Sequence, residues 1–184
     1  MQTRAFRIRP AVPADVPALF AMKRRLAQAA GAGDTLRATT EDWLRDAFGT
    51  AARFGLFVAE NAGAIIGMVA YNEIYMTALG GPVFAIQDLF VEPEHRKFGA
   101  GRALVAEVAA AAIAKGIPLI ELNVRDDNPA RKFYRRAGFR HLKECLTYAI
   151  GGEAMLDLAL AATAHSAPSA DAPPGTIKVC EGPI

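Results

Sequence analysis

The sequence predicts a mixed α/β domain built on a central, mostly antiparallel sheet. Segments with strand patterns outnumber segments with helix patterns, in the order β-α-α-β-β-β-α-β-α-β-β. The connections between most consecutive strands are short enough for these strands to pair antiparallel. The segment Val83–Val91 is almost wholly apolar, which indicates a strand covered on both faces and therefore a central place in the sheet.

One strand and two helices are predicted in the first part of the chain. Apolar and polar residues alternate over Ala5–Ala11, which is typical of a strand. A helix is predicted from Asp15 to Ala30, where apolar residues recur at helical spacing and a Gly-Ala-Gly-Asp sequence follows. A shorter helix is predicted with Thr40 as its N-cap, acidic residues in its first turn and Gly49 as its end.

Strands dominate the middle of the chain. Period-two patterns predict strands at Leu56–Glu60 and Ala64–Met76, with an Asn-Ala-Gly turn between them. The apolar strand Val83–Val91 follows a second glycine-rich turn. A helix is then predicted from Gly101 to about Lys115, and a further strand covers Leu119–Val124.

One helix and two strands are predicted to complete the domain. Asn128 is expected to cap the helix, with Pro129 at its first position and Gly138 at its end. Two strand-like segments, residues 141–150 and 153–160, flank a Gly-Gly pair and predict a hairpin.

The end of the chain has a different composition. Residues 162–184 are rich in Ala, Ser and Pro and show no periodicity, so we expect a flexible tail after a domain of residues 1–161. The alternative is that Thr176–Cys180 docks on the domain as a short extra strand.

Composition excludes several classes of protein. A formal charge of +2 predicts no nucleic-acid partner. No segment approaches the roughly 20 apolar residues of a membrane span, and the start has no secretory signal, so no membrane partner is expected. Cys145 and Cys180 form no disulfide framework, which favours a reducing compartment such as the cytoplasm. His95, His141 and His165 are not spaced as ligands, so no metal site is predicted.

The segment Val91–Leu104 lies between the apolar strand and the next helix and carries two glycines, Gly99 and Gly101. Glycine lets the backbone approach a ligand closely, and the first N–H groups of the helix have no acceptor within it. The helix dipole adds partial positive charge, and three cationic side chains add full charge: Arg96, Lys97 and Arg102. These features favour a phosphate site. The alternative is a tight turn whose glycines serve packing.

Two motifs resemble those of the GNAT family of N-acetyltransferases. The sequence Arg96–Gly101 fits the family's Arg/Gln-x-x-Gly-x-Gly/Ala signature. The sequence Asn128–Phe139 is similar to its second motif, in which Asn precedes Phe-Tyr and Gly-Phe. The resemblance covers roughly Ala5 to Leu160.

The resemblance implies a GNAT fold in which the two central strands splay apart around acetyl-CoA as co-substrate. The pyrophosphate is expected on the backbone of Lys97–Arg102, the pantetheine arm along Leu89–Val91, and Tyr134 opposite the sulfur. The full set of implied cofactor-binding residues is Leu89, Phe90, Val91, Arg96, Lys97, Phe98, Gly99, Ala100, Gly101, Arg102, Asn128, Ala130, Phe133 and Tyr134.

Within the family, the segments Gly67–Met76 and Ala85–Val91 are similar to the polyamine and thialysine acetyltransferase branch. The implied acceptor is a small-molecule amine such as a diamine, polyamine or amino acid. Glu73, Asp88, Tyr71 and Tyr75 could hold its cation. This sequence departs from the branch at Gln87, which replaces the first acid of a Glu-Asp pair, while Asp88 retains the second.

An alkyl amine is protonated at neutral pH and needs a base before it attacks a thioester. The candidate bases are Asp88, Glu73 and Glu121. Gln87 and Asp88 are expected on opposite faces of their strand. If Gln87 faces the substrate, Asp88 faces away, and the base is then a water chain or Glu73. Tyr134 is the candidate acid for the departing thiolate, and the alternative is that it packs beside its neighbour on a helix face.

Other functions stay open at this point. A protein, peptide or antibiotic amine is an alternative acceptor. A non-catalytic acyl-CoA-binding module is an alternative class, because Gln87 stands where the branch has an acid. A homodimer is a further possibility that the resemblance implies.

Overall fold

The structure is a computed structural model, and it describes residues 6–143, 150 and 152–164. The chain forms two compact units, Met1–Arg131 and Lys132–Ile184, and each is described by itself.

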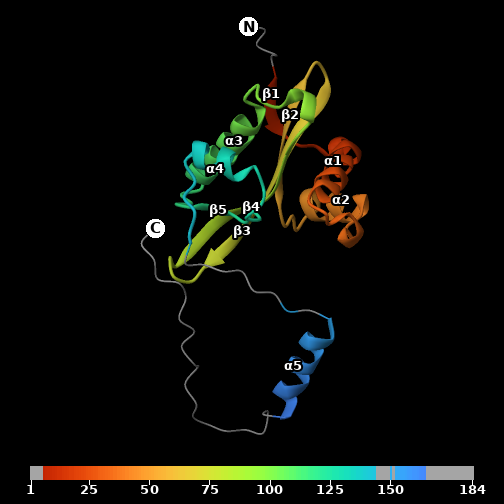
Figure 1. Ribbon diagram of the computed structural model, residues 1–184, viewed down its shortest axis with the longest axis vertical. Coiled ribbons are helices and arrows are strands. Elements are labelled where there is room, and N and C mark those ends of the chain that lie inside the picture. Colours follow the sequence, from red (N-terminus) through yellow and green to blue (C-terminus); the bar gives the residue numbers. More distant parts are fainter. Residues whose placement is uncertain (1–5, 144–149, 151, 165–184) are drawn as a thin grey trace. The chain divides into compact units, whose positions relative to one another are not determined.

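The first unit is built on a five-stranded sheet in the order β1-β2-β3-β4-β5 (Figure 1). The first three pairs of neighbours are antiparallel, and β4 and β5 are parallel. This confirms the predicted mixed, mostly antiparallel sheet. The strands are β1 (Arg7–Pro10), β2 (Gly55–Asn61), β3 (Ala64–Met76), β4 (Gly81–Val91) and β5 (Ile120–Leu122).

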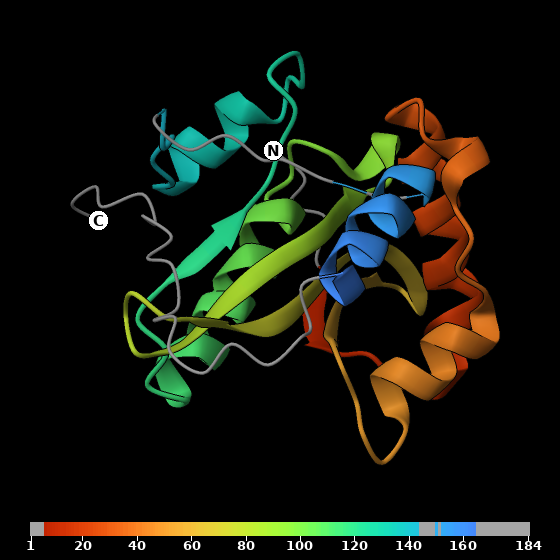
Figure 2. The same cartoon turned by 90° about the horizontal axis from the view of Figure 1, so that it is seen from below.

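Three helices cover the two faces of this sheet. Helices α1 (Val16–Ala29) and α2 (Thr40–Phe48) lie on one face, and α3 (Ala100–Ala114) lies on the other (Figures 1 and 2). Short 3-10 turns precede α1 and α3 and follow α1, at Pro13–Asp15, Pro93–His95 and Gly33–Thr35 respectively. The connection from β4 through α3 to β5 is the crossover that a parallel pair requires.

The start of α2 differs by one residue from the prediction. Thr39 is the N-cap: its hydroxyl accepts from the Asp42 N–H at 3.1 Å, and the Asp42 carboxylate accepts from the Thr39 N–H at 2.9 Å. This reciprocal capping box satisfies two N–H groups, whereas a cap at Thr40 would leave the acid at the wrong spacing. Gly49 ends the helix as predicted.

The core between the sheet and α1–α2 is apolar and closely packed. Trp43 makes edge-to-face contacts with Phe20 at 5.8 Å and Phe54 at 5.6 Å between ring centroids. Burying such side chains stabilises the fold by roughly 1.5–3 kcal/mol each. The buried members of this cluster are Val16, Leu19, Met22, Trp43, Leu56, Val58, Met68, Ala70 and Phe90.

The second unit contains most of α4 (Arg131–Ala137) and all of α5 (Gly152–Ala164). Gly138 ends α4 as predicted, with a φ of 105° and a bond from the Phe139 N–H to the Tyr134 carbonyl at 3.0 Å. The predicted strand over residues 153–160 is wrong, because this segment is helical. Its Glu, Ala, Leu and Met residues all favour helix, and this outweighs the Gly-Gly turn signal.

The rest of the predicted hairpin falls largely on residues 144–149, outside the described residues. The tail beyond residue 164 and its alternative strand at Thr176–Cys180 lie outside them too, so the domain boundary at 161 stays a prediction. Within the described chain, no helix is long and apolar enough to cross a membrane. No group of three or more His, Cys, Asp or Glu that could hold a metal is found there either.

Candidate active site

The candidate site begins where β4 and β5 part. The two strands pair over only three positions, from Phe84 opposite Ile120 to Ile86 opposite Leu122. Strand β5 ends there, whereas β4 continues to Val91. Over that last stretch, no strand in the described part of the chain pairs with the side of β4 that faces away from β3. This confirms the splayed central strands and leaves a strand edge to which an extended ligand can bind.

A β-bulge separates the two parts of β4. Ala70 lies opposite Asp88 and Tyr71 lies opposite Ile86, so Gln87 has no partner on β3. Bulges of this kind change the direction of main-chain groups and side chains along a strand.

The bulge decides which main-chain groups reach the strand edge. Before it, the Phe84 N–H donates to the Leu119 carbonyl at the β5 side. After it, the Glu92 N–H donates to the Ile66 carbonyl on β3, and antiparallel pairing alternates between the two sides. Phe90 therefore bonds to β3, while the N–H and C=O groups of Leu89 and Val91 face the gap.

The same bulge places Gln87 and Asp88 on one face of the sheet, so the prediction of opposite faces is wrong. The Asp88 carboxylate accepts two bonds from the Lys23 ammonium of α1, at 2.7 and 2.9 Å. The Gln87 amide donates to the Asn72 side-chain oxygen at 2.8 Å. Asn72 is two residues from Ala70, which packs in the core under α1, so both polar pairs belong to that face.

The loop that opens α3 presents backbone N–H groups. Gly99 is the N-cap with a φ of 93° and receives no side-chain cap. Lys97 adopts the left-handed conformation too, with a φ of 70°, which is rare for a residue with a side chain. The first backbone bond of the helix runs from the Ala103 N–H to the Gly99 carbonyl at 3.0 Å. The N–H groups of Ala100 and Gly101, in the first turn, therefore have no acceptor inside the helix and can bind an anion.

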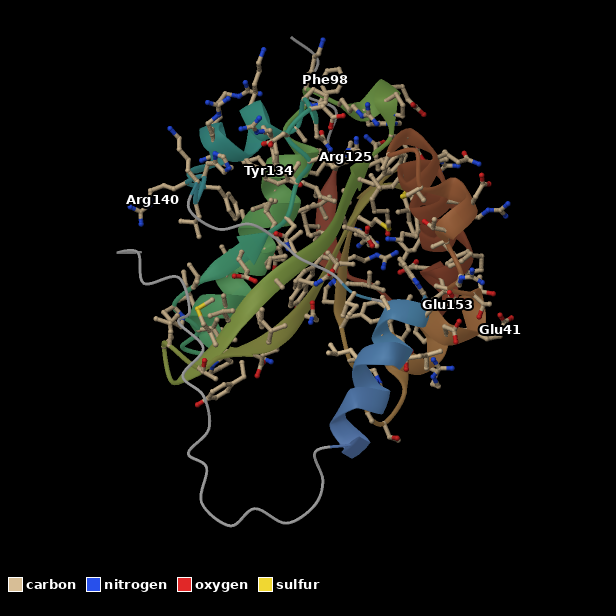
Figure 3. All side chains as sticks on the ribbon, turned by 60° about the horizontal axis from the view of Figure 1, so that its bottom comes forward. Glu41, Phe98, Arg125, Tyr134, Arg140 and Glu153 are labelled. Atoms are coloured by element: carbon tan, nitrogen blue, oxygen red, sulfur yellow. The ribbon has the colours of Figure 1, made fainter. Side chains whose placement is uncertain are left out.

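Arg96 links the loop to the strand edge. Its Nε donates to the Val91 carbonyl at 2.9 Å, and its guanidinium lies 5.8 Å from the Phe90 ring centroid. Arg25 of α1 lies 5.8 Å from the same centroid and pairs with Glu92. These contacts fix the end of β4 relative to the loop. Phe98 lies at the outer end of the loop (Figure 3), and its side chain is 48% exposed.

A pocket of about 290 Å³ lies beside Asp88 on the α1 face. Lys23 lines it and was missed as a site residue at the sequence level. One signal was present: Lys23 directly follows Met22 within the apolar stripe of α1, where a charged residue is out of place. The eight residues that line the pocket are Lys23, Leu26, Ala27, Ala30, Ala32, Thr35, Leu36 and Asp88.

The structure does not bring Glu73, Tyr71 and Tyr75 together with Asp88. Glu73 accepts from Lys115 of α3 at 3.0 Å, on the opposite face of the sheet. Tyr71 stacks on Phe57 at 5.6 Å on that same face, and burial raises the pKa of its phenol. Tyr75 is 68% exposed near the tip of the β3–β4 hairpin. Glu121 lies on β5 opposite Ala85.

The predicted residues of the second motif have local partners. The Asn128 side-chain oxygen accepts from the Ala130 N–H at 2.8 Å, and the Arg131 N–H donates to the Asn128 carbonyl at 3.2 Å. Asn128 therefore forms a turn just before α4, which begins at Arg131, so the prediction of Asn128 as N-cap and Pro129 as first helical residue is wrong. The Tyr134 ring contacts Phe133 at 5.2 Å and Phe139 at 5.8 Å, within the second unit (Figure 3). The role of Tyr134 at the sulfur stays a prediction.

A parted sheet, an open strand edge and an N–H-lined loop before a helix together define a site for a ligand with an extended arm and an anionic group. Residues 22–139 match the model of the Acetyltransferase (GNAT) family. The chain therefore belongs to this family, and it is an N-acetyltransferase.

Relatives agree with this assignment. The thialysine N-epsilon-acetyltransferase of Sus scrofa is 31% identical in an alignment 164 residues long, and the match covers 83% of this chain and 96% of the relative. The Mus musculus protein of the same name is 31% identical over 165 residues, with the same coverage of both chains.

Solved structures share the fold. An integron cassette protein from the mobile metagenome of V. cholerae has a TM-score of 0.69 at 21% identity, covering 84% of this chain and 97% of its own. An aminoglycoside acetyltransferase from a soil metagenomic sample, in complex with sisomicin, has a TM-score of 0.67 at 17% identity, covering 79% and 95%.

Proposed function

We propose that the protein transfers the acetyl group of acetyl-CoA to a primary amine of a small molecule. One observation carries this proposal: a strand edge and an N–H-lined loop, two backbone surfaces that can bind a ligand, follow one another directly in the chain. The edge of β4 at Leu89 and Val91 leads directly into the N–H-lined loop that ends at Arg102, and Arg96 connects the two. An extended amide-containing arm suits the strand edge, and a pyrophosphate suits the loop.

The residues of the segment suit acetyl-CoA in a second respect. Nothing lies within 4 Å of the position that a Cβ on Gly99 would take, so the loop is open at its turn. Arg96 and Lys97 add positive charge beside the N–H groups, which favours an anionic group there. Asn128, Ala130, Phe133 and Tyr134 complete the proposed set from the second motif.

We place the acceptor amine beside Asp88. This carboxylate can accept about four hydrogen bonds, and Lys23 supplies two donors, so an incoming ammonium can bind alongside. Asp88, directly or through water, takes one proton from the ammonium and leaves the neutral amine. The amine nitrogen then bonds to the acetyl carbon as the carbon–sulfur bond breaks, and Tyr134 gives a proton to the sulfur. The second proton of the nitrogen leaves as the amide forms and returns through water to the Tyr134 oxygen, so Tyr134 is restored. Backbone N–H groups near the bulge are suited to polarise the carbonyl.

Three acceptor classes remain within this proposal: diamines, polyamines and amino acids. The name of the pig and mouse relatives, thialysine N-epsilon-acetyltransferase, supports a small amine acceptor. A non-catalytic acyl-CoA-binding module is the second candidate, and Gln87 favours it because an amide cannot accept the amine proton. Cytoplasmic location and a homodimer accompany the proposal as expectations from the cysteine content and the family.

Thiol release from acetyl-CoA with a panel of primary amines tests the proposal, with product masses as the second measurement. We expect an N-acetylated product from at least one amine and a large loss of rate in Tyr134→Phe. Binding of acetyl-CoA without turnover of any amine would favour the non-catalytic module. Failure to bind acetyl-CoA would exclude both.

A further inference from the structure

The pocket beside Asp88 has an unusual balance of charge for a site that receives cations. Its volume of about 290 Å³ is at the small end of the range for ligand sites. Five of its eight lining residues are apolar and small or medium-sized: Leu26, Ala27, Ala30, Ala32 and Leu36. Thr35 is the uncharged polar member, and its hydroxyl already donates to the Ala32 carbonyl at 2.9 Å.

The charged residues of the pocket cancel one another. Asp88 is the one acid among the lining residues, and Lys23 pairs with both of its oxygens. The side chains are 11% and 25% exposed, so solvent screens this pair less than a surface pair. Asp34, the acid closest in sequence to the lining residues of the α1–α2 connection, is exposed and does not line the pocket.

The described residues that line the pocket supply no second anion. Arg24 and Arg25 directly follow Lys23 on α1, and Arg25 engages Glu92. An acceptor with one ammonium can share Asp88 with Lys23 and bury its chain against the apolar lining. When an acceptor carries two or three ammonium groups, a second one held within the pocket lies against alanine and leucine side chains, close to the Lys23 charge. Desolvation and like-charge repulsion both oppose that placement.

We propose that this pocket selects a primary amine with a single cationic centre and an apolar body, and that Lys23 excludes polyamines. The inference rests on the proposed function and narrows its acceptor class. It departs from the polyamine acceptors that the resemblance implies. Lys23 acts here as a specificity-determining residue, because it neutralises the one carboxylate of the pocket and repels a second cation.

The test compares kcat/KM for hexylamine and for spermidine by thiol release, in the full-length protein. We expect wild type to prefer hexylamine by about tenfold or more, given the repulsion by Lys23. Lys23→Met is expected to lower this preference by about tenfold, because Asp88 is then free for a polycation. Ala30→Glu, which adds a carboxylate to the lining, is expected to shift the preference in the same direction.

Arg24→Met is the matched control. It removes a neighbouring cation from the same helix, at an exposed position that does not line the pocket, and should leave the ratio unchanged. Circular dichroism and melting temperature verify that each variant folds. Calorimetric binding of the two amines in the presence of CoA gives the same comparison independently of turnover, including in a variant with low activity.

The outcomes separate the two proposals. Preferred turnover or binding of spermidine by wild type would overturn the inference while leaving the acetyltransferase proposal intact. An unchanged ratio in Lys23→Met would overturn the role of Lys23. Acetyl-CoA binding with no product from any amine would overturn the proposed function, and the calorimetric comparison would then still decide which class of amine the pocket accepts.

Discussion

The two sides of the proposed active site are built in different ways. The cofactor side consists mainly of backbone groups from one continuous segment, from Leu89 to Arg102. The acceptor side consists of side chains from separate segments, and its central pair, Lys23 and Asp88, is 65 residues apart in the sequence. A backbone surface depends on conformation and tolerates many side chains, whereas a side-chain pocket changes its ligand when one residue changes. The cofactor side can therefore keep its conformation while substitutions on the acceptor side change which amine is bound.

Gly99→Val gives the largest expected effect and tests the backbone side. A β-branched residue at a φ of 93° is strained, and its side chain crowds the loop where the pyrophosphate is proposed. Affinity for acetyl-CoA should fall about 100-fold or more by calorimetry.

Gly80→Val is the matched control for this prediction. Gly80 has a φ of 64° and open space around it, but it lies in the turn between β3 and β4, at the opposite end of β4 from the loop. The Gly80→Val substitution should strain the backbone similarly and leave the affinity for acetyl-CoA unchanged. Equal losses of affinity in both variants would show that strain, and not the loop, is responsible.

Asp88→Asn tests the acceptor side. If Asp88 accepts the amine proton, kcat should fall about 100-fold while the affinity for acetyl-CoA stays the same. Glu73→Gln tests the other candidate base by the same assay. Glu73 pairs with Lys115 on the far face, so we expect a change of kcat of less than about threefold. A larger loss at Glu73 than at Asp88 would reverse the assignment.

Asp15→Asn tests how α1, which carries Lys23, is anchored. The Asp15 carboxylate is largely buried and accepts from Arg9 at 2.6 and 3.0 Å and from the Val12 N–H at 2.8 Å. Its loss should lower the free energy of unfolding by about 2 kcal/mol at pH 7.

The pH dependence of this effect has a definite sign. The bond from Arg9 lowers the pKa of Asp15 in the folded state, so its contribution is fully present above the unfolded pKa of about 3.9. It is lost as pH falls through the lower, folded pKa. Denaturant unfolding from pH 6 down to pH 2 should therefore show a smaller loss of stability in Asp15→Asn than in wild type. Glu60, whose pKa is lowered mainly by its bond from Arg9 as well, remains in the variant. If the free energy of unfolding fell equally with pH in wild type and in Asp15→Asn, the lowered pKa would not belong to Asp15.

Arg96→Ala should have the smallest effect. Its guanidinium binds the Val91 carbonyl, so it mainly holds the end of β4, and acetyl-CoA should bind about three- to fivefold more weakly. Arg96→Lys keeps the charge but not the directed Nε–H bond. If the lysine variant binds like wild type, then charge and not this bond explains the contribution of Arg96.

The contrast between a cofactor side made of one continuous segment and an acceptor side made of separate segments explains what the sequence could predict. The loop was recognisable because glycines, cations and a helix start are adjacent in the chain, and the strands of the sheet follow period-two patterns. The bulge at Gln87 was not predictable, since one extra residue in an apolar strand leaves no mark in the composition, yet it moved Asp88 to the α1 face. The Lys23 pair depends on tertiary packing, and the helix over residues 153–160 was hidden by the adjacent glycines.

Residue-resolved amide exchange with and without acetyl-CoA tests the central claim most directly. The account predicts slower exchange at Leu89 and Val91 and at Gly99 to Arg102 when acetyl-CoA is added. It predicts little change at Phe90, whose N–H is assigned to the β3 ladder. Unchanged exchange at Leu89, Val91 and the loop under saturating acetyl-CoA would contradict it.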